Sequence, residues 1–169
     1  SNFGPLDMDD ALDGHRFESN QMIYSLLARA IEYEVIPKCV QREISILPYS
    51  PLAQGLLAGK FAAANDVPAG RARTRHFDSR TRDGARHGEH GCEAQTFAAI
   101  DQLRKVCERN GASMADVSLA WCLHQPAVTS VLAGARHPEH IRDNVRAAAL
   151  RLDQPTLAEL DAITNPVKQ

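Results

Sequence analysis

Hydrophobic positions along the chain follow two different periods, and the changes between them predict a series of strands and helices. Residues 17–25 read as an extended run, and residues 44–47 read as a second strand that ends in a rigid turn between Pro48 and Pro51. A third run, residues 128–133, is rich in β-branched residues. We therefore expect three short strands, with residue 1 as the tip of a fourth.

Apolar residues at helical spacing fill the segments between these strands. Pro37 is expected to bend or restart the helix that contains it, and Ser113 is expected to cap another. After Pro138, the spacing predicts a helix with Ile141, Val145 and Ala148 facing inward. The expected helices cover residues 8–12, residues 31–42, residues 93–110, a segment after residue 113, a segment after residue 138 and residues 156–163.

One segment, residues 65–91, has a different character. Arginine, glycine and histidine dominate it, and it holds hardly any apolar residues. Loops of this length within a compact domain are usually lids or disordered segments. The sequence therefore predicts a long polar loop here.

The alternation of short apolar strands with helices indicates the α/β class, with parallel β/α units and a sheet buried on both faces. The chain has 169 residues, which suffices for one domain with a sizeable core. A complete eightfold β/α barrel normally needs about 250 residues. A full barrel therefore does not fit in this chain.

Composition narrows the class of partner. The chain is 44% hydrophobic and 24% charged with a net charge of −2, which is too balanced to indicate nucleic acid or an anionic membrane as a partner. Its four cysteines form no C-x-x-C pair, and no stretch resembles a secretory leader or the run of about 20 apolar residues that crosses a bilayer. We expect a cytoplasmic protein with reduced thiols and a small-molecule ligand.

Ligand sites of parallel β/α proteins gather at the carboxyl ends of strands. The amides of Asn2 and Gln21 follow two of these ends and suit a carboxamide group. Tyr49 offers an aromatic face, and Arg136 offers a planar fork for a phosphate. Together they indicate a nicotinamide nucleotide lying across the strand ends.

Five motifs carry a resemblance to a known family. They are SNF at residues 1–3, SNQ at 19–21, YSLL at 24–27, LPYSPLAQGLLAGK at 47–60 and TSVLAGAR at 129–136. In this order and spacing the chain resembles the aldo-keto reductases, particularly their general, oxidative-stress-like and potassium-channel β-subunit-like branch. The resemblance implies a parallel (β/α)8 TIM-barrel fold, of which residues 1–169 would be the C-terminal, NADP(H)-binding half, with the last three to four β/α units and the C-terminal helix.

The resemblance also implies residue roles. Ser1, Asn2 and Gln21 would bind the nicotinamide carboxamide, and Tyr49 would stack on the nicotinamide ring. Ser50, Leu52, Gln54 and Gly55 would surround the pyrophosphate, largely through backbone amides. Gly134, Ala135 and Arg136 would hold the adenosine 2′-phosphate, and His140 and Asn144 would lie at the base end. Arg136 argues for NADP over NAD, whereas His140 departs from the Gln or Glu usual among relatives.

By the same resemblance, the parent enzyme would transfer a hydride from NADPH to an aldehyde or ketone. The Asp, Tyr, Lys and His that protonate the carbonyl precede this segment in the family, so no catalytic residue is assigned here and the isolated chain is expected to be inactive. The alternative is a non-catalytic module that binds nucleotide or a partner protein. A half-barrel leaves open sheet edges, so we expect association with an N-terminal half or self-association.

Other readings of individual residues stay open. His87, His90 and Cys92 have the ligand types of a zinc site but lack a fourth ligand. The polar loop weakly disfavours a steroid-like substrate and leaves the substrate otherwise undetermined. Arginines at positions 71, 73 and 75 would be either a lid over the cofactor phosphates or solvated side chains, and an acid pair would need Tyr24 or Tyr33 with Lys38 or Lys60.

Overall fold

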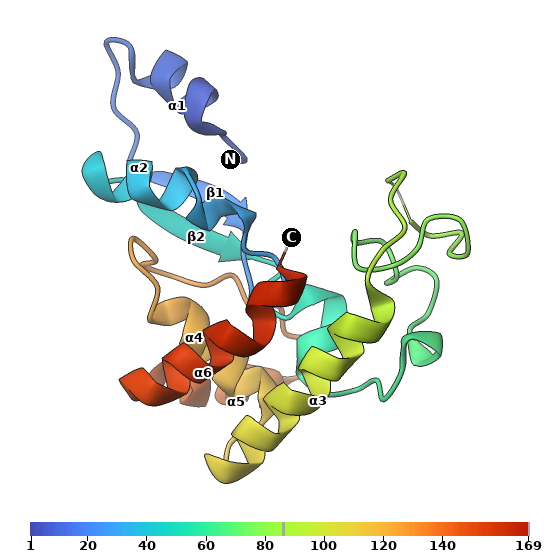
Figure 1. The fold of residues 1–169 in the computed structure, drawn as a ribbon. Helices are drawn as coiled ribbons and strands as arrows, with labels where there is room; N and C mark the ends of the chain where they lie inside the picture. The colour runs from blue at the N-terminus through green and yellow to red at the C-terminus, as the bar shows by residue number, and fades with distance from the viewer. Residues whose placement is uncertain (86, 169) are drawn as a thin grey trace.

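The computed structural model describes residues 1–85 and 87–168 and places two parallel strands beside a group of helices (Figure 1). β1 (Ser19–Ile23) and β2 (Ser45–Tyr49) pair in parallel, and α2 (Val35–Gln41) lies in the crossover that parallel strands require. The remaining α-helices are α1 (Pro5–Leu12), α3 (Glu93–Arg109), α4 (Met114–Leu123), α5 (Pro138–Ala149) and α6 (Gln154–Thr164). Short 3-10 helices occur at Ala30–Glu32, Ala53–Ala58, Ala64–Asp66 and Asn165–Val167.

A third segment runs along the free edge of β2. The N–H of Ile46 donates to the carbonyl of Ala127 at 2.7 Å, and the N–H of Leu132 donates to the carbonyl of Pro48 at 2.9 Å. Isolated parallel bridges join Ile46 to Val128 and Tyr49 to Leu132, so five residues of this segment lie opposite four of β2. The extra residue interrupts the ladder. The strand predicted at residues 128–133 is therefore present only as two isolated bridges.

The first three residues lie along the other edge of the sheet, beside β1. The N–H of Asn2 donates to the carbonyl of Gln21 at 2.9 Å. The buried side chain of Asn20 holds Phe3 from both sides, because its Nδ2 donates to the Phe3 carbonyl at 2.9 Å and its Oδ1 accepts from the Phe3 N–H at 3.3 Å. These residues lie where the tip of a fourth strand was expected, but they form neither a strand nor a bridge, and the φ of Asn2 is 58°.

Local signals placed several helices correctly. The hydroxyl of Ser113 accepts from the N–H of Asp116 at 3.0 Å and caps α4 as predicted. Pro37, in contrast, does not bend α2. It is the third residue of that helix, where a backbone N–H has no intrahelical acceptor, so its missing N–H costs nothing. The break predicted at Pro37 falls instead between Ala30–Glu32 and α2.

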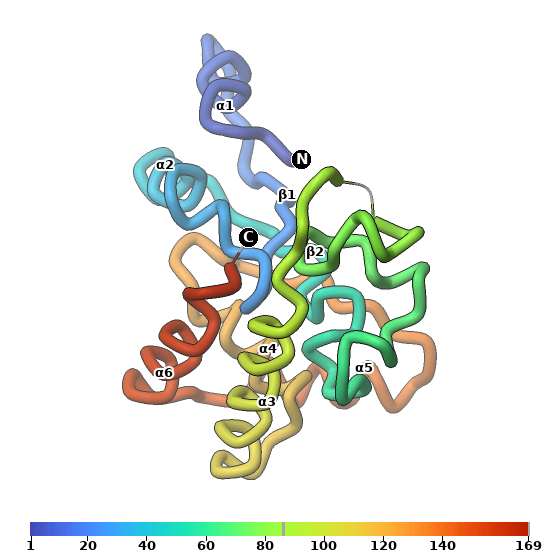
Figure 2. The backbone as a smooth tube through the Cα atoms, turned by 45° about the vertical axis from the view of Figure 1, so that its right-hand side comes forward, coloured from blue at the N-terminus to red at the C-terminus, as the bar shows by residue number. Residues whose placement is uncertain are grey.

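The helices α3, α4, α5 and α6 gather on one side of the sheet, and α1 lies apart from them (Figure 1). Figure 2 shows α3 and α6 side by side, and residues of these two helices are in contact. Their inner faces join β1 and β2 in one hydrophobic core. The largest fully buried side chains are Trp121, Tyr24, Phe77, Met8, Leu26, Leu27, Ile46, Leu56, Leu57, Ile100, Leu103 and Leu160.

The predicted orientation of α5 is wrong. Ile141 and Val145 are 58% and 66% exposed, Ala148 is also exposed, and Ala147 is the residue that is buried. Helical spacing identified an apolar stripe but not the surface that covers it. In the part of the chain that the structure describes, this stripe faces outward.

The segment predicted as a polar loop, residues 65–91, has no strand and no α-helix among its described residues. It nevertheless contributes to the core, since the side chains of Ala72, His76 and Phe77 are almost completely buried. Figure 1 shows the segment, in green, on the side toward which both strand arrows point. It therefore lies at the carboxyl ends of the strands.

Candidate functional site

The register of the two strands brings predicted site residues onto one face of the sheet. Gln21 lies opposite Leu47 and Ile23 lies opposite Tyr49, so Gln21 and Tyr49 are two positions apart on that face. The alternate residues, Asn20 and Met22, point into the core. The side of the sheet that carries Gln21 and Tyr49 is the more exposed one.

Asn2 completes this group. Its backbone is fixed to β1 by the hydrogen bond to the Gln21 carbonyl, and the hydroxyl of Tyr49 lies 3.0 Å from its side-chain Oδ1. Ser1 precedes it and is exposed. Two amide side chains and one aromatic ring from three separate segments thus meet at the strand ends, which is the set of groups that a nicotinamide carboxamide and its ring require.

The turn after β2 has an unusual backbone. Ser50, Ala53, Gln54 and Gly55 all have positive φ, with values of 53°, 45°, 58° and 103°. The N–H groups of Ser50 and Leu52 donate no hydrogen bond to any described residue. Free backbone N–H groups in a turn with left-handed residues can bind an anion, although Pro51 supplies no N–H between the two here. These groups could accept an anionic ligand.

Arg71 lies against the same turn. A Cβ added to Gly55 would be 3.4 Å from Nη1 of Arg71, so the guanidinium lies close to the turn. Its side chain makes no ion pair within residues 1–85 and 87–168, whereas Arg75 pairs with Glu89 at 3.4 Å. The sequence did not distinguish Arg71 from Arg73 and Arg75. Its position beside Gly55 depends on how the loop folds back.

The remaining predicted residues lie together at the start of α5. The N–H of Arg136 donates to Nδ1 of His140 at 3.3 Å, and Nδ2 of Asn144 is 3.5 Å from the carbonyl of Ala133. Gly134, Ala135 and Arg136 are exposed. An exposed arginine next to a helix N-terminus combines positive charge with the helix dipole, as an anion site needs. The bridge from Leu132 to Tyr49 links this group to the strand ends.

Buried titratable groups elsewhere are not suited to catalysis. Burial and the neighbouring Glu32 carboxylate raise the pKa of Tyr24 far above its usual range, and its hydroxyl donates to Glu32 at 2.9 Å. Burial also raises the pKa of the Cys122 thiol to about 12 and that of Cys107 to about 11. A protonated, buried thiol is a poor nucleophile. These groups are parts of the core.

The alternative acid pair and zinc site do not assemble. Tyr33 faces Lys168, whose Nζ is 4.9 Å from the ring centroid, and Lys38 binds the carbonyl of Pro5 at 2.7 Å. Nε2 of His87 lies 2.9 Å from the carbonyl oxygen of Thr74. Within the described residues, no three His, Cys, Asp or Glu side chains form a group that could hold a metal ion.

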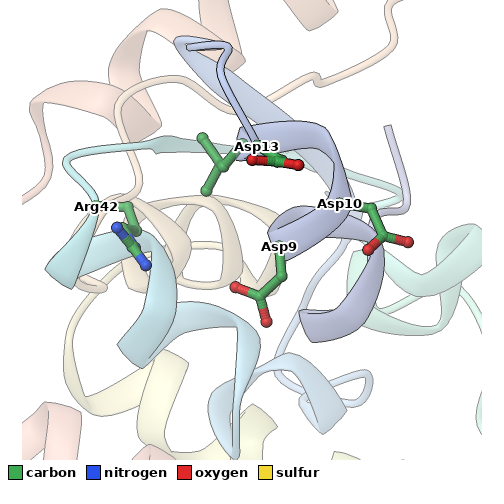
Figure 3. Close-up of a pocket in the computed structure, with 5 residues that line it drawn as sticks. Asp9, Asp10, Asp13 and Arg42 are labelled. Carbon is green, nitrogen blue, oxygen red and sulfur yellow. The ribbon is translucent and has the colours of Figure 1, made fainter.

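A surface hollow of about 570 Å³ lies between α1 and the end of α2 (Figure 3). Asp9, Asp10, Asp13 and Arg42 line it together with Leu12. Asp13 and Arg42 precede β1 and β2, so the hollow is at the amino ends of the strands. That end of a β/α barrel is associated with stability and not with ligand binding. The hollow is thus separate from the candidate site.

His76 fastens the long loop to the C-terminal segment. Its ring is 2% exposed, with Nε2 3.1 Å from the carbonyl of Val167 and Nδ1 3.0 Å from the hydroxyl of Thr74. Burial lowers the pKa of His76 below its ordinary value. The neutral ring can donate through Nε2 and accept through Nδ1, so it satisfies both contacts.

This geometry predicts an acid-sensitive contribution to stability. Because the pKa is lower in the folded chain, the unfolded chain binds more protons, and stability falls as the pH drops from about 6.5 toward the folded pKa, with a slope of at most about 1.4 kcal/mol per pH unit. Urea unfolding at pH 7.5 and pH 5.5 checks this. His76→Gln should reduce the difference between the two pH values, whereas the exposed control His15→Gln should not. Equal pH dependence in all three proteins would contradict it.

Similar proteins are known. The sequence model of the Aldo/keto reductase family matches residues 1–165. The NADH-specific methylglyoxal reductase of Escherichia coli K12 is 33% identical over 132 residues, which are 78% of this chain and 37% of that protein. The L-glyceraldehyde 3-phosphate reductase of Escherichia coli O157:H7 is 32% identical over 148 residues, covering 84% of this chain and 40% of that protein. The chain thus spans about two fifths of the length of these relatives.

A solved structure shows the same fold. The glycerol dehydrogenase from Gluconobacter oxydans matches this chain with a TM-score of 0.78 at 24% identity, over 98% of this chain and 48% of that one. The two parallel strands, the segment bridged to β2 and the surrounding helices therefore correspond to part of a β/α barrel, as the sequence predicted.

Proposed function

This chain belongs to the aldo/keto reductase family, and from that premise we propose that it is the cofactor-binding part of an NADP(H)-dependent oxidoreductase that reduces aldehydes or ketones by hydride transfer. One observation carries the proposal most directly. Asn2, Gln21 and Tyr49 come from three segments and meet on one face at the carboxyl ends of the strands. In this proposal Ser1, Asn2 and Gln21 bind the nicotinamide carboxamide and Tyr49 stacks on the ring.

The two phosphate-bearing parts of the cofactor would be bound by separate positive regions. The turn from Ser50 to Gly55 supplies free backbone N–H groups for the pyrophosphate, and Arg71 adds a positive charge beside it. The bound cofactor supplies the hydride. The chain's own contribution is to orient the nicotinamide and to neutralise the phosphates.

The choice of NADP over NAD rests on Arg136. Its exposed guanidinium next to the start of α5 suits the adenosine 2′-phosphate, with Gly134 and Ala135 beside it and His140 and Asn144 toward the base. Family membership alone does not decide this choice, because one relative is named as NADH-specific. The proposal therefore depends on this side chain.

Replacing Arg136 tests the coenzyme preference. Arg136→Ala should weaken NADPH binding by about 1.5 to 3 kcal/mol, the contribution of a hydrogen bond to a charged group, and should leave NADH binding nearly unchanged. Isothermal titration with both coenzymes measures this. Arg151→Ala, an exposed arginine beyond the other end of α5, is the matched control and should change neither. Equal losses for NADPH and NADH would exclude the role given to Arg136.

We propose that the proton-donating Asp, Tyr, Lys and His of the reaction belong to the other half of the barrel, so this chain alone should not reduce carbonyls. Apolar side chains on two of its surfaces are open: Ile23 and Leu132 at the sheet, and Ile141 and Val145 on α5. An N-terminal half-barrel, or a second copy of this chain, would cover them. A non-catalytic nucleotide-binding module is the alternative, and it would bind NADPH without turnover even when such a half is supplied.

The substrate and the compartment are proposed on chemical grounds. The polar segment at the strand ends favours a small polar carbonyl compound over a steroid-like one. Cys39, Cys107 and Cys122 form no disulfide with any described residue, which favours a reducing cytoplasm. None of the helices in the described part of the chain is both long enough and apolar enough to cross a membrane.

A further inference from the structure

We infer that the hydroxyl of Tyr49 is a positioning group. It sets the orientation of the Asn2 side-chain amide and, through that amide, the orientation of the bound nicotinamide carboxamide. This inference rests on the proposed function and deepens it. There the ring of Tyr49 is assigned to stacking, which leaves the hydroxyl without a task.

The contact itself joins two of the candidate site residues. Oη of Tyr49 donates to Oδ1 of Asn2 at 3.0 Å. The backbone of Asn2 is already fixed, because its N–H donates to the Gln21 carbonyl at 2.9 Å and its φ is 58°. Rotation of the amide by 180° would exchange its oxygen and nitrogen at nearly the same shape. The Tyr49 hydroxyl selects between these two orientations.

The selected orientation gives Asn2 one chemical role. With Oδ1 engaged by Tyr49, the Nδ2 group is left as the donor toward the ligand side, where a carboxamide oxygen can accept. The side chain of Gln21 makes no hydrogen bond to any described residue, so its oxygen is available for the carboxamide NH2. One fixed donor and one acceptor bind the carboxamide in one orientation only. The carboxamide oxygen would then lie toward Asn2 and its NH2 group toward Gln21.

Tyr49→Phe isolates the hydroxyl, since phenylalanine keeps the ring needed for stacking. The matched control is Tyr33→Phe, which removes a hydroxyl from a residue that is 69% exposed and outside the site. In the ligand-free protein, the side-chain NH2 resonances of Asn2 should shift in Tyr49→Phe and remain unchanged in Tyr33→Phe. This measurement reports on the contact without depending on cofactor binding.

Cofactor titrations then test the role. Tyr49→Phe should raise the Kd for NADPH about three- to tenfold, the effect of one neutral hydrogen bond. The same change in an Asn2→Ala background should raise it less than about twofold, because the hydroxyl would act only through Asn2. A hydroxyl that merely supported the fold, or touched the cofactor itself, would have the same effect in both backgrounds.

The outcomes separate the inference from the proposed function. Unchanged Asn2 resonances in Tyr49→Phe, or equal losses of NADPH affinity in the two backgrounds, would overturn the inference while leaving the proposed function in place. Failure of the unmodified protein to bind NADPH would overturn the proposed function and, with it, the role of Asn2. Shifted resonances together with a loss that disappears in Asn2→Ala would establish the positioning role.

Discussion

Replacing Arg29 with Met is expected to lower the free energy of unfolding by about 3 kcal/mol, because it would remove the buried cation that binds two partly buried carboxylates, and only Glu32 would keep a second cation, Lys168 at 3.8 Å. Arg29 is 5% exposed, and its guanidinium binds Glu32 through Nε at 2.6 Å and through Nη2 at 3.0 Å. Nη1 donates to the hydroxyl of Thr164 at 2.9 Å, and Nη2 is 3.3 Å from Asp161. Arg29 thus joins the segment after β1 to the last α-helix.

Two aromatic residues extend this network. Nε1 of Trp121 donates to Asp161 at 2.9 Å, and the guanidinium of Arg29 lies 5.3 Å from the Trp121 ring centroid. The hydroxyl of Tyr24 donates to Glu32. Loss of Arg29 would therefore disturb donors and acceptors from three parts of the chain, the segment after β1, α4 and α6, which is why the expected effect exceeds that of a surface ion pair.

Urea unfolding followed by circular dichroism measures this change. The matched control is Arg109→Met, which breaks an ion pair with Glu159 of similar length, 2.6 Å, between side chains that are 58% and 45% exposed. Exposed pairs contribute about 0 to 1 kcal/mol, so the control should be nearly neutral. Similar losses of unfolding free energy in both variants would show that Arg29 contributes no more to stability than an exposed ion pair does.

Phe77→Ala is expected to destabilise the chain by about 3 kcal/mol or more, the usual effect of truncating a buried phenylalanine. Phe77 is 1% exposed although it belongs to the polar segment 65–91. The guanidinium of Arg82 lies 5.7 Å from its ring centroid, and Arg82 is paired with Glu93 at the start of α3 at 2.7 Å. Phe77 is therefore an anchor of the segment that borders the candidate site.

The same change should expose the segment to proteolysis. Trypsin cleaves after arginine, so residues 65–91 should be cut faster in Phe77→Ala than in the unmodified protein under native conditions. Phe17→Ala, which truncates a half-buried ring before β1, serves as the control for a general loss of stability. If Phe77→Ala changed stability by less than about 0.5 kcal/mol, as a surface substitution does, the segment would be a solvated loop.

The sequence predicted elements well where the signal is local. Ser113 caps α4 through its own hydroxyl, and Pro138 opens α5 as the first residue of that helix. It failed where the outcome depends on distant neighbours. The strand at residues 128–133 is reduced to two bridges by a one-residue mismatch with β2, and the apolar stripe of α5 faces outward. Neither the register nor the covering surface is encoded in the segment itself.

In the candidate site, too, the sequence indicated the residues but not the contacts that depend on the fold. The family motifs singled out Asn2, Gln21 and Tyr49, and the structure brings the three together, but their individual roles in cofactor binding stay predictions. The motifs did not point to Arg71, because only the fold places its guanidinium beside Gly55. Nor did they predict the bond from Tyr49 to Asn2, since stacking uses the ring and not the hydroxyl.

The most direct test of the central claim is a titration of this chain with NADPH, followed by the fluorescence of its single tryptophan, Trp121, and by thermal unfolding. Tryptophan emission overlaps the absorption of the reduced nicotinamide, so binding should quench it. We predict saturable quenching and a higher Tm with NADPH than with NADH at equal concentration. No quenching and no change in Tm would contradict the claim that these residues form a cofactor site in this chain.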